Sequence, residues 1–139
     1  MWGRKHKKLA VALTCADWRL HKRKVDMNRR LCKLLGVEGV DLIAVPGPDG
    51  LLKPERSSEW QTAIAQIKLL LGAHAPSLLI VLAHQRCAGH PVSDADHDTD
   101  VLATAKALKA ETGFGGPVRA MLLVYHSDTS WDFKSVGQF

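Results

Sequence analysis

The sequence predicts a single α/β domain with a mainly parallel β-sheet of about four to five strands, flanked by helices. Strand-like and helix-like segments alternate four times along the chain, a pattern typical of parallel sheets. The strand-like segments are nearly continuous apolar runs, as expected where helices cover both faces of a sheet. The chain has 139 residues, of which 46% are hydrophobic, and this is enough for one core.

The first half of the chain predicts two strands around a helix. Residues 9–15 form an apolar run that ends at Thr14 and Cys15, which indicates a buried strand. Residues 21–35 have helical spacing, and Gly36 follows as a C-cap. The predicted apolar face of this helix contains Val25, Asn28, Leu31, Cys32, Leu34 and Leu35. Residues 41–45 form a second buried strand, and the Pro/Gly-rich residues 46–50 form a loop.

The second half predicts two more strand and helix pairs. Ser57 or Ser58 caps a helix that runs to about residue 71, and residues 78–83 form the third strand. Ser93 or Asp94 starts a long helix that ends near Thr112. A glycine-rich turn at 113–117 leads into a fourth strand over 119–126, and residues 127–139 form a loop or an edge strand.

Charge and cysteine content limit the partners. Residues 1–35 carry a net charge of +9 and residues 36–139 a net charge of −4, so we expect residues 1–8 to form a basic tail of the single domain 1–139. The basic residues lack the interleaved aromatic residues that bind single-stranded nucleic acid, and a nucleic-acid partner is not favoured. No apolar run is long enough to cross a membrane. Three widely spaced cysteines and no secretion signal predict a cytoplasmic protein without disulfides.

Two short motifs contain the residues that can carry chemistry. Cys15, Asp17 and Arg19 follow the first predicted strand, and His84 and Cys87 follow the third. Ligands bind beyond the carboxyl ends of the strands in parallel sheets, so two thiolates and one imidazole converge if these strands are neighbours. Two cysteines and one histidine suit Zn²⁺ and leave a fourth position open for water-derived chemistry.

The spacing of Asp17 and Arg19 allows three roles for the carboxylate. Held by the guanidinium fork of Arg19, it can accept a hydrogen bond from a zinc-bound hydroxide and orient it. Released from Arg19, it can coordinate the metal as a fourth ligand and close the site. The two side chains can also form an ion pair that is only structural.

The two motifs, Cys-x-Asp-x-Arg and His-x-x-Cys, together resemble the β-class carbonic anhydrases over about residues 9–126. The resemblance implies that Cys15, His84 and Cys87 bind zinc and that Asp17 and Arg19 form the catalytic dyad. It also implies a parallel sheet with a late antiparallel strand, a homodimer or an oligomer built from dimers, and reversible hydration of carbon dioxide to bicarbonate by zinc-bound hydroxide. The sequence departs from the family at residues 45–49 and at Ala88, in loops that shape the substrate pocket.

Other functions remain open. Related folds hydrolyse carbon disulfide or carbonyl sulfide, and a zinc-binding scaffold without catalysis is a third possibility. A nucleophilic cysteine is less favoured, because no Cys-x₅-Arg loop is present. Four histidines are candidate proton shuttles, since neutral imidazole titrates near working pH: His21, His90, His97 and His126. Gln85 and Arg86 are expected at the rim of the pocket or at a subunit interface, Trp18 is a candidate wall of the pocket, and Cys32 is assigned to helix packing.

Overall fold

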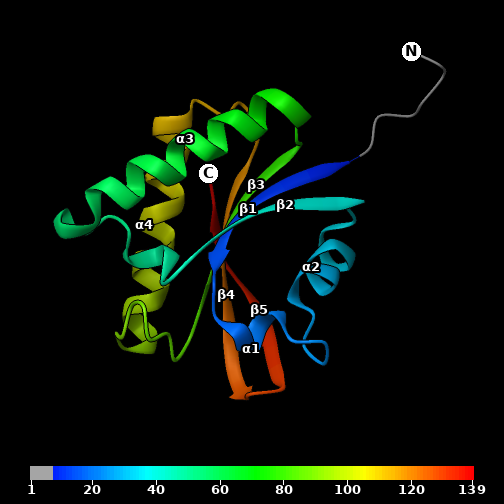
Figure 1. The fold of residues 1–139 in the computed structure, drawn as a ribbon, viewed down its shortest axis with the longest axis vertical. Coiled ribbons are helices and arrows are strands. Elements are labelled where there is room, and N and C mark those ends of the chain that lie inside the picture. Colours follow the sequence, from blue (N-terminus) through cyan, green and yellow to red (C-terminus); the bar gives the residue numbers. More distant parts are fainter. Residues whose placement is uncertain (1–7) are drawn as a thin grey trace.

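The computed structural model describes residues 8–139, so the predicted basic tail, apart from Lys8, lies outside the described residues. Strands and helices alternate as the sequence predicts (Figure 1). The elements are β1 (Leu9–Cys15), α1 (Trp18–His21), α2 (Met27–Leu35), β2 (Gly39–Val45), α3 (Ser57–His74), β3 (Leu78–His84), α4 (Asp94–Thr112), β4 (Val118–Ser127) and β5 (Ser130–Gln138). Two short 3₁₀ turns, Pro48–Gly50 and Pro54–Arg56, connect β2 to α3.

The five strands form one sheet in the order β2-β1-β3-β4-β5. The first four strands are parallel, and β5 pairs antiparallel with β4. Because β1 lies between β2 and β3 and is parallel to both, the carboxyl ends of β1 and β3 are side by side. The predicted fold class is therefore confirmed, and the chain segment after residue 127 is an edge strand.

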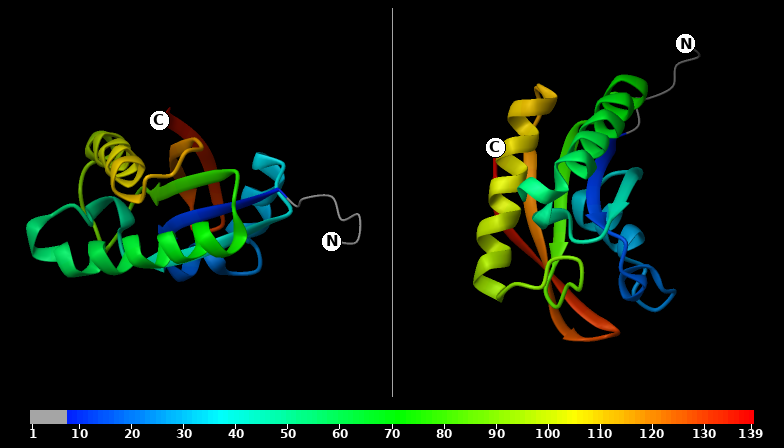
Figure 2. Two further views of the ribbon diagram at one scale, coloured as in Figure 1. Left: turned by 90° about the horizontal axis from the view of Figure 1, so that it is seen from above. Right: turned by 60° about the vertical axis from the view of Figure 1, so that its left-hand side comes forward.

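Helices cover both faces of the sheet (Figures 1 and 2). Successive residues of β1 contribute to opposite faces: Val11 and Leu13 pack with α3 and α4, whereas Ala10 and Ala12 pack with α1 and α2. All seven residues of β3 are buried, which explains its continuous apolar sequence. Among residues 8–139, no helix has both the length and the apolar composition needed to cross a membrane.

The helix predicted over residues 21–35 begins only at Met27, and His21 is the last residue of the separate turn α1. Asp26 has a left-handed backbone with φ of 40° and caps α2, its carboxylate accepting a hydrogen bond from the Arg29 backbone N–H. The backbone between α1 and α2 is therefore not helical, although the apolar spacing continues through it. Leu34, predicted to lie on the packed face, is 55% exposed, because Met27 and Leu31 form the buried side of α2.

Two predicted helix starts have different outcomes. Ser93 caps α4 as predicted, because its hydroxyl accepts a hydrogen bond from the Asp96 backbone N–H. The serine cap predicted for the other long helix is wrong, since Ser57 is the first residue of α3 and no side chain caps this end. The preceding 3₁₀ turn leads directly into the helix, which leaves no extended residue to serve as a cap.

Candidate metal centre

The two cysteine motifs meet at the carboxyl edge of the sheet because β1 and β3 are neighbours. Cys15 is the last residue of β1, His84 is the last residue of β3, and Cys87 lies in the turn that follows. The register pairs Thr14 with Leu82, so the two strands end almost level. His84 and Cys87, which follow Cys15 by 69 and 72 positions, thus lie beside it, as the sequence predicts.

The ligand atoms of Cys15, His84 and Cys87 all lie within 4.8 Å of one another, and the three residues are buried. They are the only group of this kind in the described part of the chain. The two sulfur atoms are 3.9 Å apart. Two sulfurs that each bind zinc at about 2.3 Å with a tetrahedral angle lie about 3.8 Å apart. The spacing of the thiols therefore fits a metal ion bound between them.

The imidazole of His84 is held in the orientation of a ligand. Its Nδ1 lies 2.6 Å from the Gln85 carbonyl oxygen, so this nitrogen carries the proton and donates it. Its Nε2 is buried and has no hydrogen-bond partner. A buried nitrogen with a free lone pair, beside two thiols, is the atom that a metal ion would satisfy.

The two thiols share one charge. The contact with Cys87, helped by the backbone N–H groups of Gly47 and Asp17, lowers the pKa of Cys15 to about 7. The same contact, together with burial, raises the pKa of Cys87 to about 12. One thiolate therefore forms near neutral pH, and the second needs a neighbouring cation. Metal binding at this site would release a proton from the pair.

Asp17 and Arg19 form a bidentate ion pair beside the Cys-His-Cys group. Arg19 donates from Nη2 to Asp17 Oδ2 at 2.7 Å and from Nε to Asp17 Oδ1 at 3.1 Å. The hydrogen bonds from Arg19 lower the pKa of Asp17, and those same bonds raise the pKa of Arg19. The carboxylate is thus ionised at neutral pH. Its Oδ2 lies 3.7 Å from His84 Nε2, close to the ligands but outside their group.

The local structure after β1 sets the position of Asp17. Its Oδ1 accepts a hydrogen bond from the Arg19 backbone N–H at 2.9 Å and so caps the single turn of α1. This cap starts α1 two residues after the end of β1, and the side chain of Arg19 bonds the same Asp17 carboxylate that caps the turn. The spacing of two residues between Asp17 and Arg19 thus lets one carboxylate accept bonds from both the backbone and the side chain of Arg19.

Sequence reasoning missed the contribution of the β4–β5 hairpin to the site. Arg19 Nη1 donates to Asp128 Oδ1 at 3.3 Å, and the guanidinium lies over the rings of Trp131 and Tyr125. The Trp131 ring also contacts the His84 ring edge to face, with centroids 5.5 Å apart. These residues follow Arg19 by more than 100 positions and belong to no motif, so no sequence signal could have identified them.

A pocket of about 490 Å³ opens beside the metal centre. Cys15, Cys87 and both members of the ion pair line it, together with Trp18, Pro46, Ala88 and Gly89. Gly89, one of the lining residues, packs closely against Gly47: Gly47 has φ of 55°, and a Cβ atom there would lie 2.6 Å from the Gly89 carbonyl carbon. Trp18, a candidate wall in the sequence, lies on the rim and is 68% exposed.

The four candidate shuttle histidines lie outside the set of residues that line this pocket. Each has a partner of its own: His21 the Cys15 carbonyl, His90 Asp100, His97 Asp49, and His126 Asp132. Gln85 and Arg86 do not line the pocket either. Gln85 Oε1 accepts a hydrogen bond from the Tyr125 N–H, and the Arg86 carbonyl accepts one from Arg19 Nη2. Cys32 lies away from the site and contacts Asn28.

Comparison with known proteins identifies the family. A model of the family described as "Putative carbonic anhydrase" matches residues 5–136. A comparison with curated proteins gave no match. The matched region contains the whole sheet except its last two strand residues, and it contains every residue of the buried Cys-His-Cys group and of the ion pair. The chain therefore belongs to this carbonic anhydrase family.

Proposed function

We propose that the protein catalyses the zinc-dependent, reversible hydration of carbon dioxide to bicarbonate. The observation that carries this proposal is a buried group of two thiols and one imidazole beside a carboxylate held by a guanidinium fork. The family to which the chain belongs supports the same reaction.

Zinc is the proposed metal because the donor set is two cysteine sulfurs and one histidine nitrogen. Three such ligands are typical of catalytic zinc, which keeps a fourth position for water or substrate. No carboxylate belongs to the ligand group among residues 8–139, and the pocket adjoins this group. Zinc bound here would act as a Lewis acid that activates a water molecule for attack at neutral pH.

Asp17 has the proposed role of orienting the nucleophile. Because Arg19 keeps the carboxyl ionised, Asp17 can only accept hydrogen bonds. A water-derived nucleophile beside the Cys-His-Cys group would donate a hydrogen bond to Asp17 Oδ2, and this bond would turn one of its lone pairs toward the pocket. The two bonds from Arg19 hold this acceptor in place, so that the orientation exists before the substrate arrives.

The walls of the pocket suit a small substrate without charge. Trp18, Pro46 and Ala88 supply apolar surface next to the metal ligands. Carbon dioxide needs such a surface more than hydrogen-bond donors, whereas the bicarbonate product is an anion that prefers water. The proposed reaction therefore couples apolar uptake of the substrate to release of the product through the open mouth.

The test is stopped-flow hydration of carbon dioxide by protein of measured zinc content. We expect turnover that rises with pH and that disappears when zinc is removed by a chelator. Fully zinc-loaded protein that hydrates no carbon dioxide between about pH 6 and 9 would refute the proposal. The same preparation would then be assayed with carbon disulfide and carbonyl sulfide, and inactivity toward both would favour a zinc-binding scaffold.

A further inference from the structure

The hairpin between β4 and β5 extends past the other strands and reaches α1, as Figure 1 shows. Tyr125 lies near the end of β4, Asp128 in the turn, and Trp131 at the start of β5. All three contact Arg19 or its partners. The hairpin is thus a third segment of the site, in addition to the two cysteine motifs.

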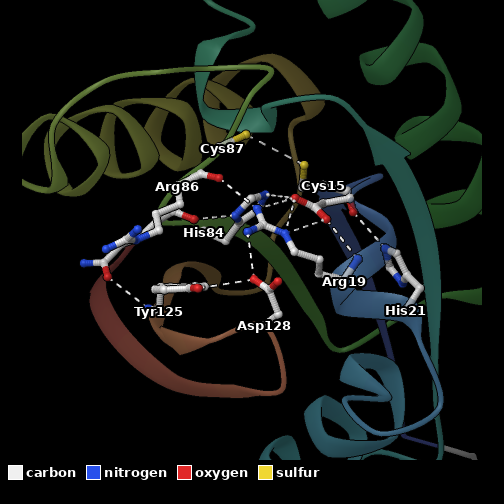
Figure 3. Close-up of polar contacts among 10 residues, drawn as sticks. Cys15, Arg19, His21, His84, Arg86, Cys87, Tyr125 and Asp128 are labelled. Carbon is white, nitrogen blue, oxygen red and sulfur yellow. Dashed lines mark hydrogen bonds and ion pairs between the residues drawn. The ribbon is translucent and has the colours of Figure 1, made fainter.

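The N–H groups of Arg19 are nearly all directed to acceptors (Figure 3). Nε and Nη2 bond the Asp17 carboxylate, and Nη2 also donates to the Arg86 carbonyl at 2.9 Å. Nη1 donates to Asp128 Oδ1. Among residues 8–139, the contact with Asp128 is the one hydrogen bond of this guanidinium that comes from outside the two cysteine motifs, and it holds Nη1, the nitrogen that does not bond Asp17.

Asp128 is itself held in position by the hairpin. Its Oδ1 accepts a second hydrogen bond, from the Tyr125 hydroxyl at 3.2 Å. Two guanidinium groups lie near the Tyr125 ring, with the Arg86 Cζ 4.4 Å and the Arg19 Cζ 6.0 Å from its centroid. The Trp131 ring, which is buried, lies 5.4 Å from the Arg19 Cζ. The hairpin thus provides both an acceptor and aromatic faces that match a planar cation.

We propose that Asp128 is a positioning residue that fixes the guanidinium plane of Arg19 and, through it, the orientation of the Asp17 carboxylate. Asp128 touches no metal ligand and acts only through Arg19. Its kinetic consequence rests on the proposed function, whereas its effect on Arg19 does not. Because the Asp128 side chain is 55% exposed, its loss should lower turnover only about two- to fivefold.

The first measurement is NMR of the Arg19 guanidinium in ¹⁵N-labelled, zinc-loaded protein. The Arg19 signals are assigned by their loss in Arg19→Lys. In the wild type we expect separate Nη1 and Nη2 signals, because both groups are hydrogen-bonded. In Asp128→Ala we expect the Nη1 signals to be averaged by exchange, because Nη1 has lost its acceptor. Asp128→Asn keeps an acceptor oxygen and should retain part of the separation. The matched control is Asp132→Ala, which removes an equal charge from the same hairpin where the carboxylate contacts His126 and not Arg19.

The second measurement is carbon dioxide hydration by the same variants at equal zinc content. We expect Asp128→Ala to lose about two- to fivefold in kcat and Asp132→Ala to match the wild type. Unchanged Arg19 signals in Asp128→Ala, or equal changes in both alanine variants, would overturn the proposal. If the wild type hydrates no carbon dioxide, the proposed function fails, and the Arg19 signals still decide whether Asp128 holds the guanidinium.

Discussion

Replacing Arg19 by alanine tests the proposed use of the ion pair most directly. The substitution removes two charge-assisted hydrogen bonds to Asp17, from Nε and Nη2. A hydrogen bond to a charged group contributes about 1.5–3 kcal/mol. If the fixed orientation of Asp17 stabilises the transition state by as much as one such bond, its loss should lower the hydration rate roughly 10- to 150-fold.

Zinc should remain bound in Arg19→Ala, because the side chain of Arg19 bonds none of the three ligand atoms. The assay is stopped-flow hydration at equal zinc content, measured beside Asp17→Asn, which should lose activity and retain zinc in the same way. Arg29→Ala is the matched control, since Arg29 is an exposed arginine of α2 and the substitution removes the same charge. If Arg19→Ala and Asp17→Asn both kept full zinc occupancy and activity within about twofold of the wild type, Asp17 and Arg19 would form a structural ion pair only.

Four further outcomes are expected. Elemental analysis of Cys87→Ser should show loss of most of the zinc with a lower melting temperature, while Cys32→Ser, outside the site, retains it. Sedimentation equilibrium should give a dimer or larger assembly, and a 15.2 kDa species alone at micromolar concentration would contradict this. Burial lowers the pKa of His97, but the hydrogen bond and the charge of Asp49 outweigh burial and raise the pKa above its usual 6.5. The pair therefore stabilises the fold fully below about pH 6.5, and this stabilisation is lost as the pH rises through the pKa of His97 in the folded protein. Thermal unfolding at pH 6 and pH 9 should therefore show a smaller pH dependence in Asp49→Asn than in the wild type. Arg86 has φ of 56°, so Arg86→Gly should leave unfolding temperatures near the wild type, because relief of backbone strain offsets the lost contact with Tyr125.

The sequence predicted the fold class and the convergence of Cys15, His84 and Cys87 because both follow from local patterns. Apolar runs marked the strands, and the topology of parallel sheets brings the ends of β1 and β3 together. The break between α1 and α2 was not predictable in the same way. It depends on the left-handed backbone of Asp26 and on the N-cap at Asp17, and neither interrupts the apolar spacing.

The contribution of Asp128 could not be predicted for a different reason. Its contact with Arg19 spans 109 positions and depends on how far the hairpin extends beyond the sheet. The length of a hairpin is fixed by pairing between β4 and β5, which has register shifts at Ala120/Met121 and Tyr125/Ser127. Such irregularities of pairing have no signature in a single sequence.

The arrangement of the site separates rigid from adjustable parts. Cys15 and His84 end the buried strands β1 and β3, so the positions of two of the three proposed ligands are set by the core. Asp17 and Arg19 lie beyond the strand on a single turn of helix, and the acceptor that fixes the far end of Arg19 is half exposed on a hairpin. Substitutions near the hairpin turn should therefore lower turnover while metal content stays high. Substitutions of buried residues in β1 or β3 should lower turnover and metal content together. Comparing zinc stoichiometry with kcat across Asp128→Ala and Ala12→Gly tests this separation, because Ala12 is fully buried in β1, in the same packed cluster as Cys15 and Cys87.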